Sequence, residues 1–159
     1  MKHFLIILVL FGVIKMAQAE DTWTVGKMNI KGKPVVYKFM SQLPDITIQK
    51  KLPWLTVISW KYDGSTNNGM PVSSENAQMI MLEDGLEEIN GEESIYLSAY
   101  TATGNNLKEF VFYISDRDAF IDNLNKSLSS HSSYPIEINF YKDEEWSDLT
   151  KLLDDFNGS

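Results

Sequence analysis

The sequence predicts an α+β domain in which an antiparallel sheet is backed by two helices. Three observations predict it. Segments whose apolar residues alternate with a period of two, as in strands, recur from residue 22 to residue 141. Two other segments space their apolar residues by three and four, as in helices. Turn-forming residues separate these segments, and no repeat or linker divides the chain, so one domain over residues 20–159 is expected.

The first expected element is an N-terminal β-hairpin. Its strands are residues 22–30 and 35–40, joined by a turn over residues 31–34 that contains glycine and proline. Residues 42–53 are expected to be irregular because two prolines interrupt them. Residues 54–60 are largely apolar in both alternating sets, which is typical of a strand covered on both faces.

A helix is expected next. Either Ser73 or Ser74 can cap its first turn by accepting a hydrogen bond from a backbone N–H group. Gly91 is placed to end the helix in a left-handed conformation. The apolar residues at helical spacing, which should face the core, are Met79, Leu82, Leu86 and Ile89.

A second hairpin, a second helix and a final strand follow. Residues 95–101 and 108–114 form the arms of the hairpin. Ser115 or Asp116 caps the helix, whose inward residues are Phe120, Ile121, Leu124 and Leu128. Residues 134–141 alternate as a strand, and residues 147–156 suit a short terminal helix.

The order from residue 54 onward is strand, helix, strand, strand, helix, strand. This is the split βαβ order of a ferredoxin-like fold, with the N-terminal β-hairpin as an extra element. The expected core is formed by five residues of two strands and the second helix: Phe110, Phe112, Leu124, Ile136 and Ile138.

Residues 1–19 have the three parts of a secretory signal peptide. A basic start at Lys2 precedes an apolar run over residues 4–14, and Ala17 and Ala19 frame a small-residue cleavage site. Eleven helical residues reach only about 16 Å, too short to span a bilayer core of about 30 Å. We therefore expect a periplasmic or secreted protein that begins near Glu20, with no stable membrane insertion.

Composition narrows the class of protein further. The chain has 14 Lys and Arg, 22 Asp and Glu and no cysteine. Export without disulfides favours a bacterial cell-envelope protein. Residues 62–107 contain eight acidic residues and no Lys or Arg, and the lysines of residues 20–61 are scattered. Nucleic-acid binding needs clustered cations, so it is not expected.

Most catalytic chemistry is also not expected. His131 is the one histidine after the signal segment, and it lies in a serine-rich run typical of a surface loop. Zinc sites need several His or Cys ligands, and serine hydrolases need a nucleophile elbow and a well-placed histidine. Phosphate-binding glycine loops and EF-hand ligand spacing are missing as well, so no metal or cofactor is expected.

Carboxylates around Trp146 leave one enzymatic alternative open. Asp143, Glu144, Glu145 and Asp148 surround this aromatic residue, as in some sugar-cleaving clefts. A hydrolase would need two of these carboxylates on opposite sides of a pocket. In the alternative, the acids are solvated on an exposed turn, Trp146 packs on the sheet edge, and none of them is catalytic. Asp143, Glu145 and Trp146 are retained as candidate binding residues.

An acidic band on the first long helix is the main candidate binding surface. It consists of Glu83, Asp84, Glu87 and Glu88. Acids four residues apart repel each other, and acids near a helix C-terminus oppose the helix dipole. The band is either a docking surface for a basic protein partner or a solvated face that keeps the protein soluble.

Several segments resemble a known family. They are residues 54–62, Pro71, residues 82–86 and 109–113, and residues 134–138 and 142–146. Together they resemble the domain of unknown function 695 family, which looks distantly similar to the regulator of ribonuclease activity B, an acidic inhibitor protein with a ferredoxin-like fold. The resemblance implies that fold and a binding role. We therefore expect an exported, non-catalytic binding or inhibitor-like protein of the bacterial cell envelope, and the carboxylate hydrolase is the alternative.

Overall fold

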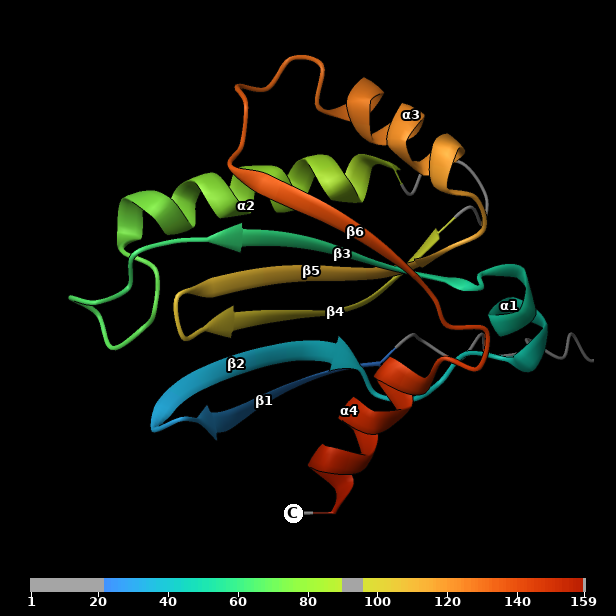
Figure 1. Ribbon diagram of the computed structural model, residues 1–159, viewed down its shortest axis with the longest axis horizontal. Helices are drawn as coiled ribbons and strands as arrows, with labels where there is room; N and C mark the ends of the chain where they lie inside the picture. Colours follow the sequence, from blue (N-terminus) through green and yellow to red (C-terminus); the bar gives the residue numbers. More distant parts are fainter. Residues whose placement is uncertain (1–21, 90–95, 159) are drawn as a thin grey trace, which may run out of the picture.

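The computed structural model describes residues 22–89 and 96–158, and its strands form one antiparallel sheet. The strand order is β1-β2-β4-β5-β3-β6 (Figure 1). The strands are β1 (Trp23–Ile30), β2 (Lys33–Met40), β3 (Trp54–Lys61), β4 (Tyr96–Gly104), β5 (Leu107–Ile114) and β6 (Ile136–Lys142). The helices are α1 (Ile46–Lys51), α2 (Ser73–Glu88), α3 (Arg117–Ser127) and α4 (Ser147–Asn157). The predicted α+β class with an antiparallel sheet is confirmed.

Two tight turns connect the hairpins. Lys31 and Gly32, with φ of 51° and 78°, join β1 to β2, and Asn105 and Asn106, with φ of 50° and 66°, join β4 to β5. Positive φ at both central residues is what a two-residue type I′ turn requires, and its twist matches that of the flanking strands. Glycine and asparagine accept this conformation at low cost, which explains why these residues punctuate the sequence.

Helices α2 and α3 cover one face of the sheet, called here the α2/α3 face (Figure 1). Phe110, Phe112 and Leu124 are buried in its core, as predicted, and Ile136 and Ile138 are partly buried against that core. The edge position of β6 explains the difference, because an edge strand has no neighbour on one side. Gly85 of α2 lies against Leu128 and His131, so the helix closely approaches the segment after α3.

The opposite face is covered by α4, so helices lie on both faces of the sheet. The prediction of a sheet backed by two helices described only one face. Leu149, Leu152 and Leu153 of α4 pack with Val111 and Tyr113 of β5. Because β3 and β5 carry apolar residues in both alternating sets, each face needs its own cover.

Two local predictions were wrong. Residues 46–51 form helix α1 between the two prolines, where an irregular segment was expected. Helix α2 begins at Ser73, with Val72 as its N-cap, so neither Ser73 nor Ser74 caps it. Asp116 does cap α3, accepting a hydrogen bond from the backbone N–H of Ala119 at 2.8 Å. The proposed signal peptide (1–19) and Gly91 lie outside the described residues.

Over residues 22–89 and 96–158, no helix is both long and apolar enough to cross a membrane.

Candidate functional site

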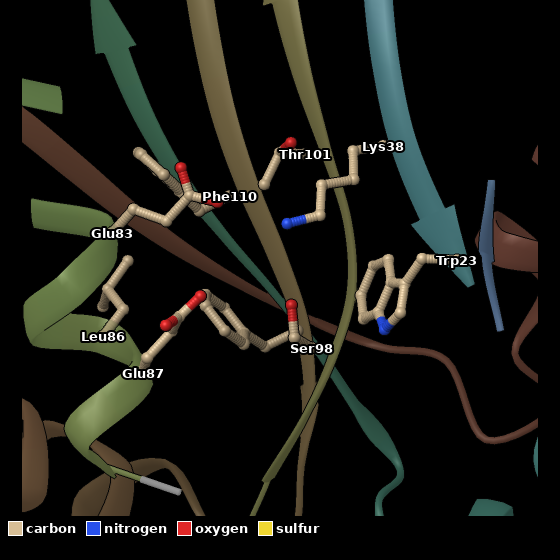
Figure 2. A pocket seen from close by; sticks show the side chains of 9 residues that line it. Trp23, Lys38, Glu83, Leu86, Glu87, Ser98, Thr101 and Phe110 are labelled. Atoms are coloured by element: carbon tan, nitrogen blue, oxygen red, sulfur yellow. The ribbon is translucent and has the colours of Figure 1, made fainter. Parts of the chain in front are cut away.

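A cavity of about 500 Å³ lies beside α2 on the α2/α3 face of the sheet. It forms because α2 packs over β3 and β5, while β2 and β1 extend the sheet beyond the helix. Helix and sheet thus make a wall and a floor. The lining residues, shown in Figure 2, are Trp23, Lys38, Glu83, Leu86, Glu87, Ser98, Thr101, Phe110 and Phe112.

The strand register determines which side chains form the floor. Lys38 pairs with Thr101, and Thr101 pairs with Phe110, so all three point to the same face. A β-bulge between Ser98 and Tyr100 adds one residue to β4. Because of this extra residue, Ser98 and Thr101 both face the cavity although they are three positions apart. The floor therefore combines aromatic rings with two hydroxyl groups.

Charges of both signs project into the cavity. Glu83 and Glu87 lie one helical turn apart on α2, and Lys38 extends from β2 toward them (Figure 2). The Lys38 ammonium group lies 5.7 Å from the centroid of the Trp23 ring, a cation–π distance. In the part of the chain that the structure describes, the ion pairs within 4.0 Å are Lys142–Glu144 and Lys151–Asp155. The three charges at the cavity are therefore not paired with one another.

A second cation lies close to the cavity floor. Lys108 of β5 donates a hydrogen bond to Thr103 Oγ1 at 2.9 Å, and its ammonium group lies 5.0 Å from the centroid of the Phe110 ring. Burial lowers the pKa of Lys108, and the negative charge of Glu83 partly opposes that shift. Positive charge from β2 and β5 thus faces negative charge from α2 across an aromatic surface.

The comparisons with known proteins give one match. A model of a family of unknown function (DUF695) matches residues 21–153. The chain belongs to this family. The match includes every residue that lines the cavity and confirms the predicted family. No curated protein and no solved structure matches the chain.

In the structure, the four residues of the predicted acidic band form two pairs with different positions. Glu83 and Glu87 line the cavity, whereas Asp84 and Glu88 are exposed on α2 and do not line it. Sequence spacing predicted the shared face of Glu83 and Glu87, but the contribution of Lys38 and Trp23 was missed. The sequence signal available for Trp23 was an aromatic residue in the alternating pattern of the first predicted strand.

Trp146 has a structural role in the DUF695 domain. Its side chain is 0% exposed and stacks on the Tyr113 ring at 3.8 Å between centroids. The indole N–H donates to the backbone carbonyls of Gln49 and Leu52 at 3.2 and 3.1 Å, which joins the end of α1 to the start of α4. Trp146 therefore cannot offer its ring to a partner, in contrast to its prediction as a binding residue. It packs on the face of the sheet, not its edge.

Asp143 is engaged in holding the start of α4. It accepts hydrogen bonds from the Tyr113 hydroxyl at 2.7 Å and from the backbone N–H groups of Ser147 and Asp148 at 2.8 and 3.1 Å. Burial opposes its ionisation, but these hydrogen bonds together lower the pKa of Asp143. A carboxylate with these partners serves as a helix cap, which gives no support to a nucleophile or acid role.

The remaining acids of this segment differ in environment. Burial raises the pKa of Asp148, and the hydrogen bond that it accepts from the Tyr100 hydroxyl at 2.8 Å opposes this shift. Glu144 and Glu145 are exposed. Neither Asp143, Glu145 nor Asp148 lines the cavity beside α2, so the structure places these candidates apart from the acidic band.

His131 lies in the loop after α3, where a surface-loop histidine was expected, and it is half-buried there. Its Nδ1 atom shares a hydrogen bond with the Tyr134 hydroxyl at 2.6 Å, and its ring lies close to Gly85. Among the residues that the structure describes, no group of three or more His, Asp and Glu side chains is arranged to hold a metal ion.

Proposed function

We propose that this DUF695 protein is an exported, non-catalytic binding or inhibitor-like protein of the bacterial cell envelope. Its binding site is the cavity beside α2, and its partner is a basic protein. The observation that carries the proposal is the pair of carboxylates, Glu83 and Glu87, that line a cavity with an aromatic floor and form no ion pair with another described residue. Binding sites typically combine an apolar lining with a few convergent polar groups in a volume of roughly 300–1,000 Å³.

The placement of the acids on α2 supports a binding role. No basic residue lies in the last turn of α2, so nothing on that turn offsets the repulsion between its acids or their conflict with the helix dipole. Such an arrangement costs the isolated domain stability. A basic partner would relieve this cost on binding, and complementary charge would also speed and orient its encounter.

Removing the cavity carboxylates is expected to separate stability from binding. The Glu83→Gln/Glu87→Gln variant should be more stable in urea by about 0.3–1 kcal/mol, because repulsion and the dipole conflict are reduced. The same variant should capture basic proteins from an envelope extract roughly tenfold more slowly at low ionic strength, with a weaker salt dependence. Denaturation curves and association kinetics with the captured protein measure the two effects.

Asp84→Asn/Glu88→Gln is the matched control. It removes the same charge from the same helix but leaves the lining of the cavity intact. Equal loss of capture in both double variants would mean that only net charge matters. Unchanged capture in the Glu83→Gln/Glu87→Gln variant would leave the acids as a solvated face and refute the proposed site.

We also propose that the fold is ferredoxin-like. Strands β4-β5-β3-β6 are adjacent in that order, and α2 and α3 lie on one face, which supports a ferredoxin-like arrangement with β1 and β2 as the extra hairpin. The distant similarity to the regulator of ribonuclease activity B, an inhibitor protein, is part of this proposal and favours binding over catalysis.

Export has its own test. Cleavage after Ala19 should give a protein that begins at Glu20 or a near neighbour and is located in the periplasm or medium. Intact-mass measurement of the protein purified from its native cells checks this expectation. Recovery of the complete chain, starting with Met1, from the soluble cytoplasm would overturn it.

A further inference from the structure

We propose that the cavity beside α2 receives the C-terminal residue of a basic polypeptide, with its carboxylate at Lys38 and its cationic side chain at Glu83 and Glu87. This inference rests on the proposed function. It specifies which part of the partner enters the cavity and in which orientation that part binds.

Lys38 is the reason to require an anion on the ligand. Its ammonium group projects into the cavity from the side opposite α2 (Figure 2), and no carboxylate of residues 22–89 or 96–158 lies within 4.0 Å of it. Lys108 adds positive charge nearby, since the field of Lys38 contributes to lowering its pKa, after burial. A ligand with positive charge alone would be attracted to one wall and repelled by the other. A ligand with both signs complements both walls.

The spacing of the walls suits one basic residue. Lys38 on β2 and Phe110 on β5 are separated by β4, through the register Lys38–Thr101–Phe110. Two strand spacings correspond to about 10 Å. Glu83 and Glu87 of α2 line the cavity on the Phe110 side, across from Lys38 (Figure 2). A lysine or arginine at a chain end carries its carboxylate on the main chain and its cation at the tip of an extended side chain, so a single residue addresses both walls.

The floor suits the body of such a residue. Methylene groups of lysine and arginine favour apolar surfaces while their charged ends remain in polar surroundings. Trp23 is 40% exposed and offers apolar surface to these methylene groups, whereas Phe110 and Phe112, at 1% and 5% exposure, lie beneath the floor and support it. The hydroxyl groups of Ser98 and Thr101 lie between the two walls and can donate hydrogen bonds to the carboxylate. A basic residue inside a chain lacks this anion, which is why the chain end is selected.

Three peptides test the proposal by calorimetry with the purified protein. The reference is acetyl-Ala-Phe-Lys with a free carboxylate; the second is its C-terminal amide, and the third has norleucine in place of lysine. Losing either charge should weaken binding roughly tenfold to a hundredfold, the range for a charge-assisted hydrogen bond. Lys38→Met should weaken the free acid and bring it close to the amide. Lys27→Met, on an exposed residue of β1 outside the cavity lining, should preserve the difference.

The outcomes separate this inference from the function on which it rests. Equal binding of acid and amide, or an acid–amide difference that survives Lys38→Met, would overturn the proposed orientation. If Glu83→Gln/Glu87→Gln still weakened both peptides in that case, the basic-partner site would stand. Failure of all three peptides to bind the wild-type protein would also overturn the inference, while the capture experiment judges the proposed function independently.

Discussion

Replacing Trp146 with alanine is expected to lower the free energy of unfolding by about 3–5 kcal/mol, the range for a large aromatic residue removed from a core. The ring is completely buried and stacks on Tyr113. Its removal leaves a cavity between β5 and α4. It also removes the N–H donor for the carbonyls of Gln49 and Leu52. Both the packing and the connection of α1 to α4 are therefore lost.

Urea unfolding followed by far-UV circular dichroism measures this loss without relying on tryptophan fluorescence. Trp146→Phe separates the two causes, because it retains an aromatic ring but lacks the N–H donor. A cost of about 1–3 kcal/mol is expected because the Leu52 carbonyl loses this donor, whereas the Gln49 carbonyl still accepts from the backbone N–H of Leu52 at 3.2 Å. Trp23→Ala is the exposed control, since Trp23 is 40% exposed, and should change stability by about 0.5 kcal/mol. A loss below about 1 kcal/mol for Trp146→Ala would contradict its place in the core.

Replacing Phe112 with alanine is also expected to cost about 3–5 kcal/mol. Phe112 is 5% exposed, and its ring centroid lies 5.5 Å from that of Tyr96 and 6.0 Å from that of Phe120. It therefore connects two strands to α3 in the core of the α2/α3 face. The same urea experiment applies, with the tryptophans now available as a second probe.

Two variants accompany Phe112→Ala. Phe112→Leu keeps an apolar body at the site and should cost clearly less than alanine. Tyr141→Ala removes an aromatic residue of β6 that is 52% exposed, and it should shift stability by about 0.5 kcal/mol. If Phe112→Ala cost less than about 1 kcal/mol, the inward face of β5 would be wrong. A one-residue slip of register would move every side chain of the strand to the other face.

Periodicity was sufficient to predict most elements of the α2/α3 face. Phe110 and Phe112 alternate with Val111 and Tyr113, and Met79, Leu82 and Leu86 recur at helical spacing, so their local structure follows from sequence neighbours. Both alternating sets of residues 54–60, in β3, are largely apolar, which indicated a second covered face. Which segment covers it depends on contacts between residues far apart in the chain, and periodicity carries no information about those.

The cavity could be predicted only in part. The spacing of Glu83 and Glu87 gave their common face, but their opposition to Lys38 results from α2 packing over β3 and β5 and leaving β2 uncovered. Trp146 was misplaced for a related reason. Its φ of 56° is left-handed, a conformation that few non-glycine residues adopt. Neither property is encoded in the alternation of apolar and polar residues.

The packing of α4 has a consequence for the timing of folding. Phe156 of α4 stacks on Phe39 of β2 with ring centroids 4.7 Å apart, so a helix that follows all six strands in the chain covers the first hairpin. Such contacts of high sequence separation form slowly. A chain growing from the ribosome cannot close this face until α4 has emerged. If the protein is exported as proposed, this late closure helps keep the nascent chain unfolded, and thus able to pass through a translocation channel, until α4 has been synthesised.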